Sequence, residues 1–125
     1  MLQKLFLLAL AGALGTLTRF GLAGFVHRFN HTSFPWGTFI VNLAGCFLAG
    51  LLWALFENRW SLPGEWRTVV LVGFMGAFTT FSTFILETSE LMRSSQWIYA
   101  IINMVFQNGI GLLAILAGIA VARII

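Results

Sequence analysis

Four long stretches of apolar residues constrain the fold of this chain more than any other feature. They cover residues 5–26, 36–56, 68–92 and 97–122, and the second and fourth contain no charged residue. A helix needs about 20 apolar residues to cross a bilayer, so each stretch is long enough to span. The sequence therefore predicts an all-α integral membrane protein, with four transmembrane helices in a single membrane domain over residues 1–125.

The scarcity of charge excludes a soluble fold. Charged residues make up 9% of the 125 residues, whereas a soluble globular domain carries about 25%. The net charge of +3 comes from a few Lys and Arg residues near the ends of the spans, which is typical of membrane proteins and does not indicate nucleic-acid binding. We expect the lipid bilayer to be the surroundings of almost the whole chain.

The positive charges are divided almost evenly between the two sides of the membrane. Four spans place Lys4, Arg59, Arg67 and Arg123 on one side, and on the other Arg28 and Arg93, joined by Arg19 if its side chain reaches outward from the first span. So small a difference sets no clear orientation. It is either the result of having few charges to count, or a sign that the chain inserts in both orientations and forms antiparallel dimers.

Polar residues inside the spans are the functional candidates, because a polar group in hydrocarbon is costly without a partner. They include Arg19 in the first span, Asn42 in the second, and Asn103, Gln107 and Asn108 in the fourth. The sequence contains no HExxH motif, no Cys/His cluster and no Gly-rich phosphate loop. We therefore do not expect an enzyme.

The third span holds a dense run of glycine and hydroxyl residues from Gly76 to Phe84. Consecutive hydroxyls compete with the backbone for hydrogen bonds, and glycine weakens a helix. One interpretation is a break near Gly76–Thr80, whose freed carbonyls need protein, water or a cation as partners. The other is a continuous helix in which each hydroxyl bonds to a preceding carbonyl.

Three phenylalanines recur in this run at a spacing of three residues, at positions 78, 81 and 84. The stripe is either ordinary packing or a set of ring edges facing a pore, and the electropositive edge of an aromatic ring favours an anion. Hydroxyls and the Asn42 and Asn108 amides add donors without fixed charge, and Arg19 adds an electrostatic attractor. The lining chemistry therefore favours an anion over a cation.

The residues Gly73–Phe84 followed by Glu87, the stretch Gly12–Arg19, and Pro35–Thr38 leading to Asn42 closely resemble the signature of the CrcB/Fluc fluoride channels. The resemblance covers essentially the whole chain. It implies a fluoride-selective passive channel that exports fluoride across the bacterial inner membrane and lowers its cytoplasmic concentration. It also implies an antiparallel, dual-topology homodimer with two pores and no other protein partner.

The same resemblance implies roles for individual residues. A structural sodium ion is expected at the dimer centre, held by the main-chain carbonyls of Gly76 and Thr79. The pore residues implied by the family motifs are Asn42, Phe81, Ser82, Thr83, Phe84 and Arg19, with Glu87 at the acidic position of the third helix. Asn108 matches a fourth-helix pore position, with Gln107 as an alternative alignment shifted by one residue. The chain departs from the family pattern at Ile85 and Leu112, where many members have serine.

A different class of protein shares part of this layout. Small proton-coupled multidrug exporters are also four-helix, dual-topology dimers. Such a carrier needs a titratable carboxylate in its binding chamber, whereas the first span of this chain contains Arg19 and no acidic residue. We keep this exporter as the alternative function.

Overall fold

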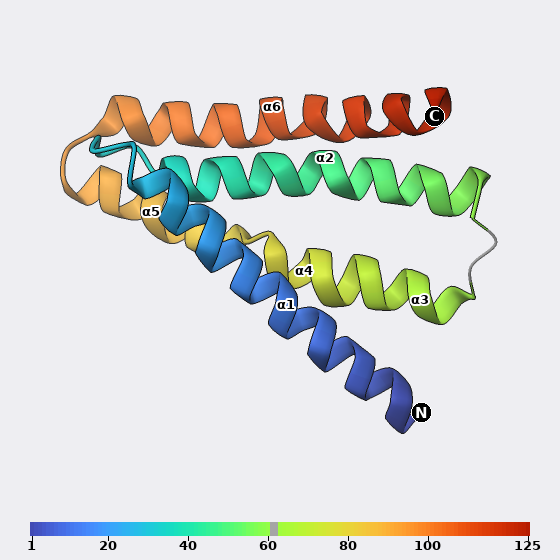
Figure 1. Ribbon diagram of the computed structural model, residues 1–125. Coiled ribbons are helices and arrows are strands. Elements are labelled where there is room, and N and C mark those ends of the chain that lie inside the picture. Colours follow the sequence, from blue (N-terminus) through green and yellow to red (C-terminus); the bar gives the residue numbers. More distant parts are fainter. Residues whose placement is uncertain (61–62) are drawn as a thin grey trace.

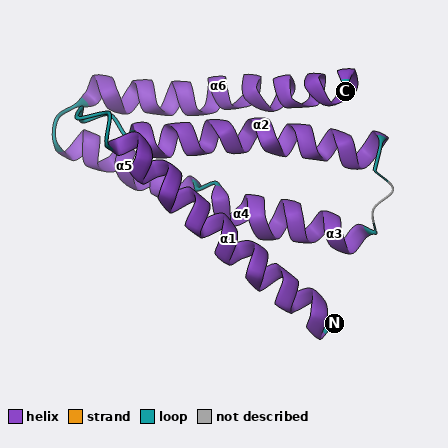
Figure 2. Cartoon of the chain, in the orientation of Figure 1, coloured by secondary structure: helices purple, strands orange, loops and turns teal. Residues whose placement is uncertain are grey.

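The computed structural model describes residues 1–60 and 63–125, which form helices joined by short loops (Figures 1 and 2). Its elements are α1 (Leu2–His27), α2 (Trp36–Asn58), α3 (Gly64–Thr68), the π-helical turn η1 (Val69–Phe74), α4 (Met75–Phe78), α5 (Phe81–Arg93) and α6 (Trp97–Ile124). Four helical segments are long and apolar enough to cross a membrane: α1, α2, the segment Gly64–Arg93, and α6. The predicted all-helical fold with four such segments is confirmed.

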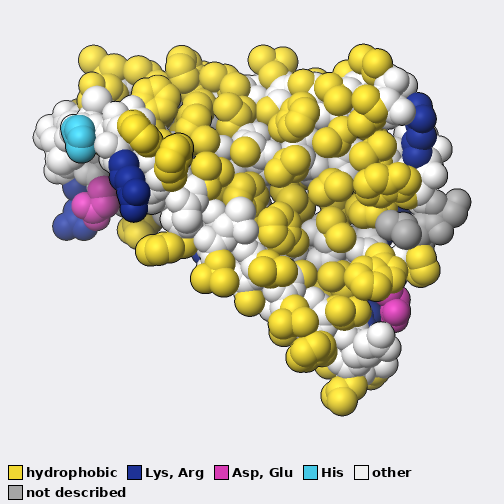
Figure 3. All heavy atoms as spheres, viewed as in Figure 1, with side chains coloured by type: hydrophobic (Ala, Val, Ile, Leu, Met, Phe, Trp, Pro, Cys, Tyr) yellow, Lys and Arg dark blue, Asp and Glu magenta, His cyan; other side chains and the backbone are white. Residues whose placement is uncertain are grey.

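Helices α2, α3–α5 and α6 run back and forth along roughly one axis (Figure 1). Helices α2 and α6 lie side by side and run in the same direction. Elements α3–α5, which come between them in the sequence, run in the opposite direction. Helix α1 crosses this group obliquely and contacts mainly η1, α2 and α4. In the face shown in Figure 3, the middle is covered by hydrophobic side chains, and the charged groups lie toward the ends. This distribution matches a bilayer with water on both sides.

Close helix contacts in this fold depend on glycine. A Cβ atom at Gly118 would collide with the Phe47 carbonyl oxygen, and one at Gly50 would collide with the Ile115 carbonyl oxygen. Both positions join α2 to α6. Gly15 has the same role between α1 and the Phe74 carbonyl oxygen. Small residues allow helix backbones to approach in lipid, where van der Waals contact replaces the hydrophobic effect as the driving force.

The third segment contains two residues with extended backbone. Helix α4 ends at Phe78, and α5 begins at Phe81. Between them Thr79 has φ −83° and ψ 158°, and Thr80 has φ −149° and ψ 117°. Thr80 is the N-cap of α5, since its Oγ1 accepts a hydrogen bond from the Thr83 backbone N–H at 3.3 Å. A side-chain oxygen at this position satisfies one of the free donors of the first turn.

Candidate functional site

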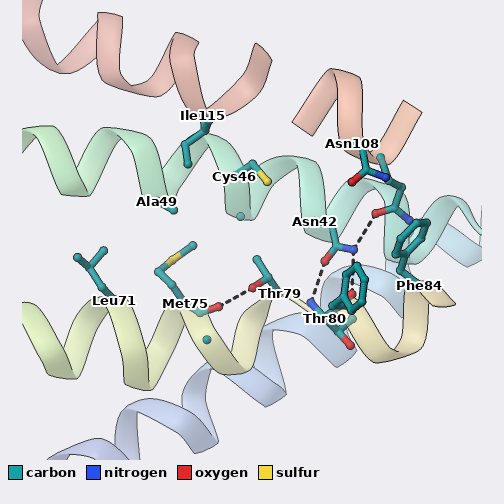
Figure 4. A pocket seen from close by; sticks show the side chains of 14 residues that line it. Asn42, Cys46, Ala49, Leu71, Met75, Thr79, Thr80, Phe84, Asn108 and Ile115 are labelled. Atoms are coloured by element: carbon teal, nitrogen blue, oxygen red, sulfur yellow. Dashed lines mark hydrogen bonds between the residues drawn. The ribbon is translucent and has the colours of Figure 1, made fainter. Parts of the chain in front are cut away.

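The two extended residues find a hydrogen-bonding partner on another helix. The Thr80 backbone N–H donates to Asn42 Oδ1 at 2.8 Å, and the Thr80 carbonyl accepts from Asn42 Nδ2 at 3.0 Å (Figure 4). The amide of Asn42 thus pairs with both polar groups of one backbone residue, much as a neighbouring strand would. Since a bilayer offers no water to replace lost helical bonds, this pairing stabilises the extended stretch.

Asn42 also contacts α6. Its Nδ2 donates a second hydrogen bond, to Gln107 Oε1 at 2.7 Å. A side-chain amide nitrogen has two hydrogens, so both donors of Asn42 are used within the protein. Asn42 lies at the meeting point of α2, the Thr79–Thr80 stretch and α6, and its geometry joins all three.

A cavity of about 380 Å³ opens beside this meeting point (Figure 4). Its walls come from α2, η1, α4, α5 and α6, and they are mainly apolar with a few convergent polar groups. It brings together six of the residues predicted from the sequence: Asn42, Gly76, Thr79, Phe81, Phe84 and Asn108. The lining residues include no acidic side chain.

The two phenylalanines of the first turn of α5 have different environments. Phe84 is 4% exposed and packs inside the chain, whereas Phe81 is 72% exposed. Their ring centroids lie 5.6 Å apart with the planes inclined at 60°. The pair therefore forms one wall of the cavity, with Phe84 held firmly by its neighbours and Phe81 projecting from the surface.

A second cavity of about 320 Å³ holds two of the other predicted residues, Arg19 and Thr83. Thr80 lines both cavities and so lies between them. Here Glu87 Oε1 accepts a hydrogen bond from Thr38 Oγ1 at 2.7 Å, while its Oε2 is buried without a partner among residues 1–60 and 63–125. Ser82 is exposed and lines neither of these two cavities.

The structure distinguishes the two neighbouring amides of α6. Asn108 is exposed, and its Nδ2 donates to the Met104 carbonyl of its own helix at 2.7 Å. Gln107, the alternative alignment, bonds directly to Asn42. Two further polar residues behind Gln107, Asn103 and Thr88, are buried and hydrogen-bonded to each other at 2.9 Å. Asn103 and Gln107 are four residues apart and so lie on one helix face. This spacing is the sequence signal that would have indicated that Asn103 and Gln107 belong together.

Four helical segments apolar enough to span a membrane, three of which enclose a small, mainly apolar cavity with a few polar groups, define a multi-pass membrane protein. Residues 6–119 match the family model described as CrcB-like protein, Camphor Resistance (CrcB). The chain belongs to this family.

Similar proteins match over their full length. The chain is 61% identical over 123 residues to the fluoride-specific ion channel FluC of Desulforapulum autotrophicum, covering 98% of each. It is 52% identical over 125 residues to the protein of the same name from Nitrosococcus oceani, covering all of both chains. The identity to that of Solidesulfovibrio magneticus is 49%, again over the whole of both chains.

The pairing of Asn42 with Thr80 yields a prediction about stability. Asn42→Leu is expected to lower the free energy of unfolding by about 1–3 kcal/mol for each Thr80 backbone group that loses its partner. The measurement is denaturant unfolding of the purified protein in detergent micelles. The matched control is Asn58→Leu, which removes only a bond to the Ala54 carbonyl at the end of α2 and is expected to cost about 1 kcal/mol or less. Equal stability of the two variants would contradict the role assigned to Asn42.

Proposed function

We propose that this protein is a fluoride-selective passive channel, a transport protein and not an enzyme. The observation that carries the proposal is the full-length similarity to proteins named fluoride-specific ion channel FluC. The cavity beside Asn42 supplies a matching site, because amide, hydroxyl and aromatic groups converge there without a carboxylate. Export of fluoride down its gradient across the bacterial inner membrane would lower its cytoplasmic concentration.

The chemistry of the cavity suits a small anion that must shed its water. In this cavity we assign the replacement of hydration to the amide of Asn108 and to the electropositive ring edges of Phe81 and Phe84. The hydroxyls of Thr83, which lines the second cavity, and of Ser82, which is exposed beside Phe81, would add donors along the pathway. Asn42 holds the surrounding groups in place, because both of its hydrogens are engaged. A positively charged side chain lining the cavity would bind the anion too strongly for fast passage. Arg19 lies in the second cavity, on the other side of Thr80, where it attracts anions toward the pathway.

An antiparallel homodimer with two pores would complete the site. Gly76, Ser82 and Asn108 are exposed although they lie in the middle of membrane-spanning segments, and the Phe81 ring beside them is 72% exposed. Polar groups at that depth need protein as a neighbour. A second copy in the opposite orientation would cover them, and the nearly even distribution of Lys and Arg allows both orientations.

Two main-chain carbonyls have the properties needed to hold the proposed sodium ion. In an uninterrupted α-helix the Gly76 and Thr79 carbonyls would accept from the N–H groups four residues later, those of Thr80 and Thr83. Here the Thr80 N–H donates to Asn42 Oδ1 and the Thr83 N–H to Thr80 Oγ1. Carbonyls freed in this way coordinate sodium in membrane proteins. When bound, the ion would link the two copies and add a fixed positive field near both pores.

The function is tested by fluoride efflux from liposomes containing the purified protein. Fluoride is expected to leave these vesicles far faster than protein-free vesicles, with chloride largely retained. Fluoride efflux no faster than in empty vesicles, together with exchange of a cationic dye for protons, would reject the channel and favour the multidrug exporter.

The phenylalanines give a second functional prediction. Phe81→Ile and Phe84→Ile are each expected to reduce fluoride flux about two- to tenfold, the range that corresponds to an aromatic ring contact of about 0.5–1.5 kcal/mol, with the dimer intact by light scattering. The control is Phe25→Ile, an exposed ring on α1 that lines neither cavity and should conduct like the wild type. Wild-type flux in both α5 variants would show that the two rings serve packing only.

The sodium ion is tested separately from conduction. Replacing sodium by N-methylglucamine at constant ionic strength is expected to weaken the dimer, because the Gly76 and Thr79 carbonyls of both copies would lose their shared ligand. Analytical ultracentrifugation in detergent measures the dimer dissociation constant in each salt. The same constant in both salts would rule out a structural sodium ion.

A further inference from the structure

A continuous chain of hydrogen bonds runs through the membrane-spanning part of the protein from Asn42 to α5. Asn42 Nδ2 donates to Gln107 Oε1 at 2.7 Å, and Gln107 Nε2 donates to Asn103 Oδ1 at 3.2 Å. Asn103 Nδ2 then donates to Thr88 Oγ1 at 2.9 Å, and Thr88 Oγ1 donates to the Phe84 carbonyl at 2.7 Å. We call the four side chains Asn42, Gln107, Asn103 and Thr88 the amide relay.

The direction of the amide relay is set by the backbone at both of its ends. The Thr80 N–H, which bonds to Asn42 Oδ1, can only donate, and the Phe84 carbonyl can only accept. Because the Thr88 hydroxyl donates to that carbonyl, it accepts from Asn103 Nδ2. Asn103 and Gln107 must then each present their oxygen toward Asn42 and their nitrogen toward Thr88. Turning one amide over would leave an oxygen facing an oxygen and a nitrogen facing a nitrogen.

This direction decides which atom of Gln107 is available to an ion. One Nε2 hydrogen of Gln107 bonds to Asn103, and the other has no partner among the described residues. Gln107 lines the cavity, whereas both hydrogens of Asn42 are engaged. The amide relay therefore leaves an N–H donor, and not a carbonyl oxygen, as the unused group of Gln107. An N–H attracts an anion and a carbonyl oxygen repels it.

We infer that Asn103 and Thr88 are positioning residues for anion recognition, which act by holding the Gln107 amide in its donor orientation. Neither residue lines the cavity, and their exposed fractions are 0% and 3%, so neither touches the ion. Because they are buried away from water, a partner lost at either position is not replaced by solvent. This inference rests on the proposed function for the identity of the anion, and on the hydrogen bonds alone for the orientation of Gln107.

Two threonines provide a matched pair of variants. Thr88→Val removes the acceptor of Asn103 Nδ2 at almost constant shape, so Asn103 is no longer anchored to α5 and its hold on Gln107 Nε2 is weakened. Thr18→Val removes a hydroxyl that likewise donates to a carbonyl four residues earlier, that of Leu14, but lies outside the relay on α1. The two substitutions are chemically identical, but only Thr88 is buried and connected to Gln107, whereas Thr18 is exposed.

Both variants are compared with the wild type in fluoride efflux as a function of concentration. Thr88→Val is expected to raise the fluoride concentration for half-maximal flux about tenfold, the effect of one hydrogen bond of ~1.4 kcal/mol, while Thr18→Val matches the wild type. Nuclear magnetic resonance of the Gln107 side-chain amide in micelles gives a readout independent of flux: fluoride should shift its proton signals in the wild type and in Thr18→Val, and much less in Thr88→Val.

A second pair of variants keeps the test decisive if Thr88→Val folds poorly. Asn103→Asp retains an oxygen that accepts from Gln107 Nε2, whereas Asn103→Leu does not, so only the leucine variant should lose the fluoride response of the Gln107 amide. The same half-maximal concentration and the same amide signals in Thr88→Val and the wild type would overturn the inference. A wild type that does not conduct fluoride would reject the proposed function instead, and the amide signals without fluoride would still show whether Thr88 and Asn103 orient Gln107.

Discussion

The pairing of the Asn42 amide with the Thr80 backbone is the interaction on which the rest of this structure depends. Two residues with extended backbone interrupt the regular bonding of a membrane-spanning segment, and the bilayer provides no water for the groups that are left. Asn42 supplies one acceptor and one donor to the same residue. Without that amide the extended stretch would be costly, and the cavity beside it would lose the wall made by Thr79 and Thr80.

Close packing allows this pairing to form. A Cβ atom at Gly45 would collide with the Thr79 side chain, so the absence of a side chain there lets α2 approach the extended stretch. Gly50 and Gly118 bring α2 against α6 in the same way, and this contact places Gln107 within hydrogen-bond distance of Asn42. These glycines do more than allow helix contacts, because the close approach that they permit brings the polar groups of different helices together. The proposed anion site depends on their spacing.

Part of the site could be predicted from residue type, since few polar residues occur in these spans and Asn42 in hydrocarbon requires a partner. The phenylalanine stripe left packing and pore lining open, and only the family resemblance selected Phe81 and Phe84. The structure brings these two rings and Asn42 to one cavity. The choice between Gln107 and Asn108 could not be made in this way. Neighbouring helix residues point about 100° apart, so the side chain that faces Asn42 depends on the rotation of α6 against α2. For the same reason the sequence did not separate Arg19 from the phenylalanines, although they line different cavities.

By itself, the sequence determined the solvent and the general fold of this protein. Four long and mainly apolar stretches predict membrane-spanning helices, because the free energy of transfer to lipid is a sum over residues and needs no knowledge of neighbours. The tertiary structure alone decided the partners of the buried polar groups and the direction of the hydrogen bonds among them. Those depend on which helix faces meet and on backbone groups such as the Phe84 carbonyl, whose position is set only when the helices have packed.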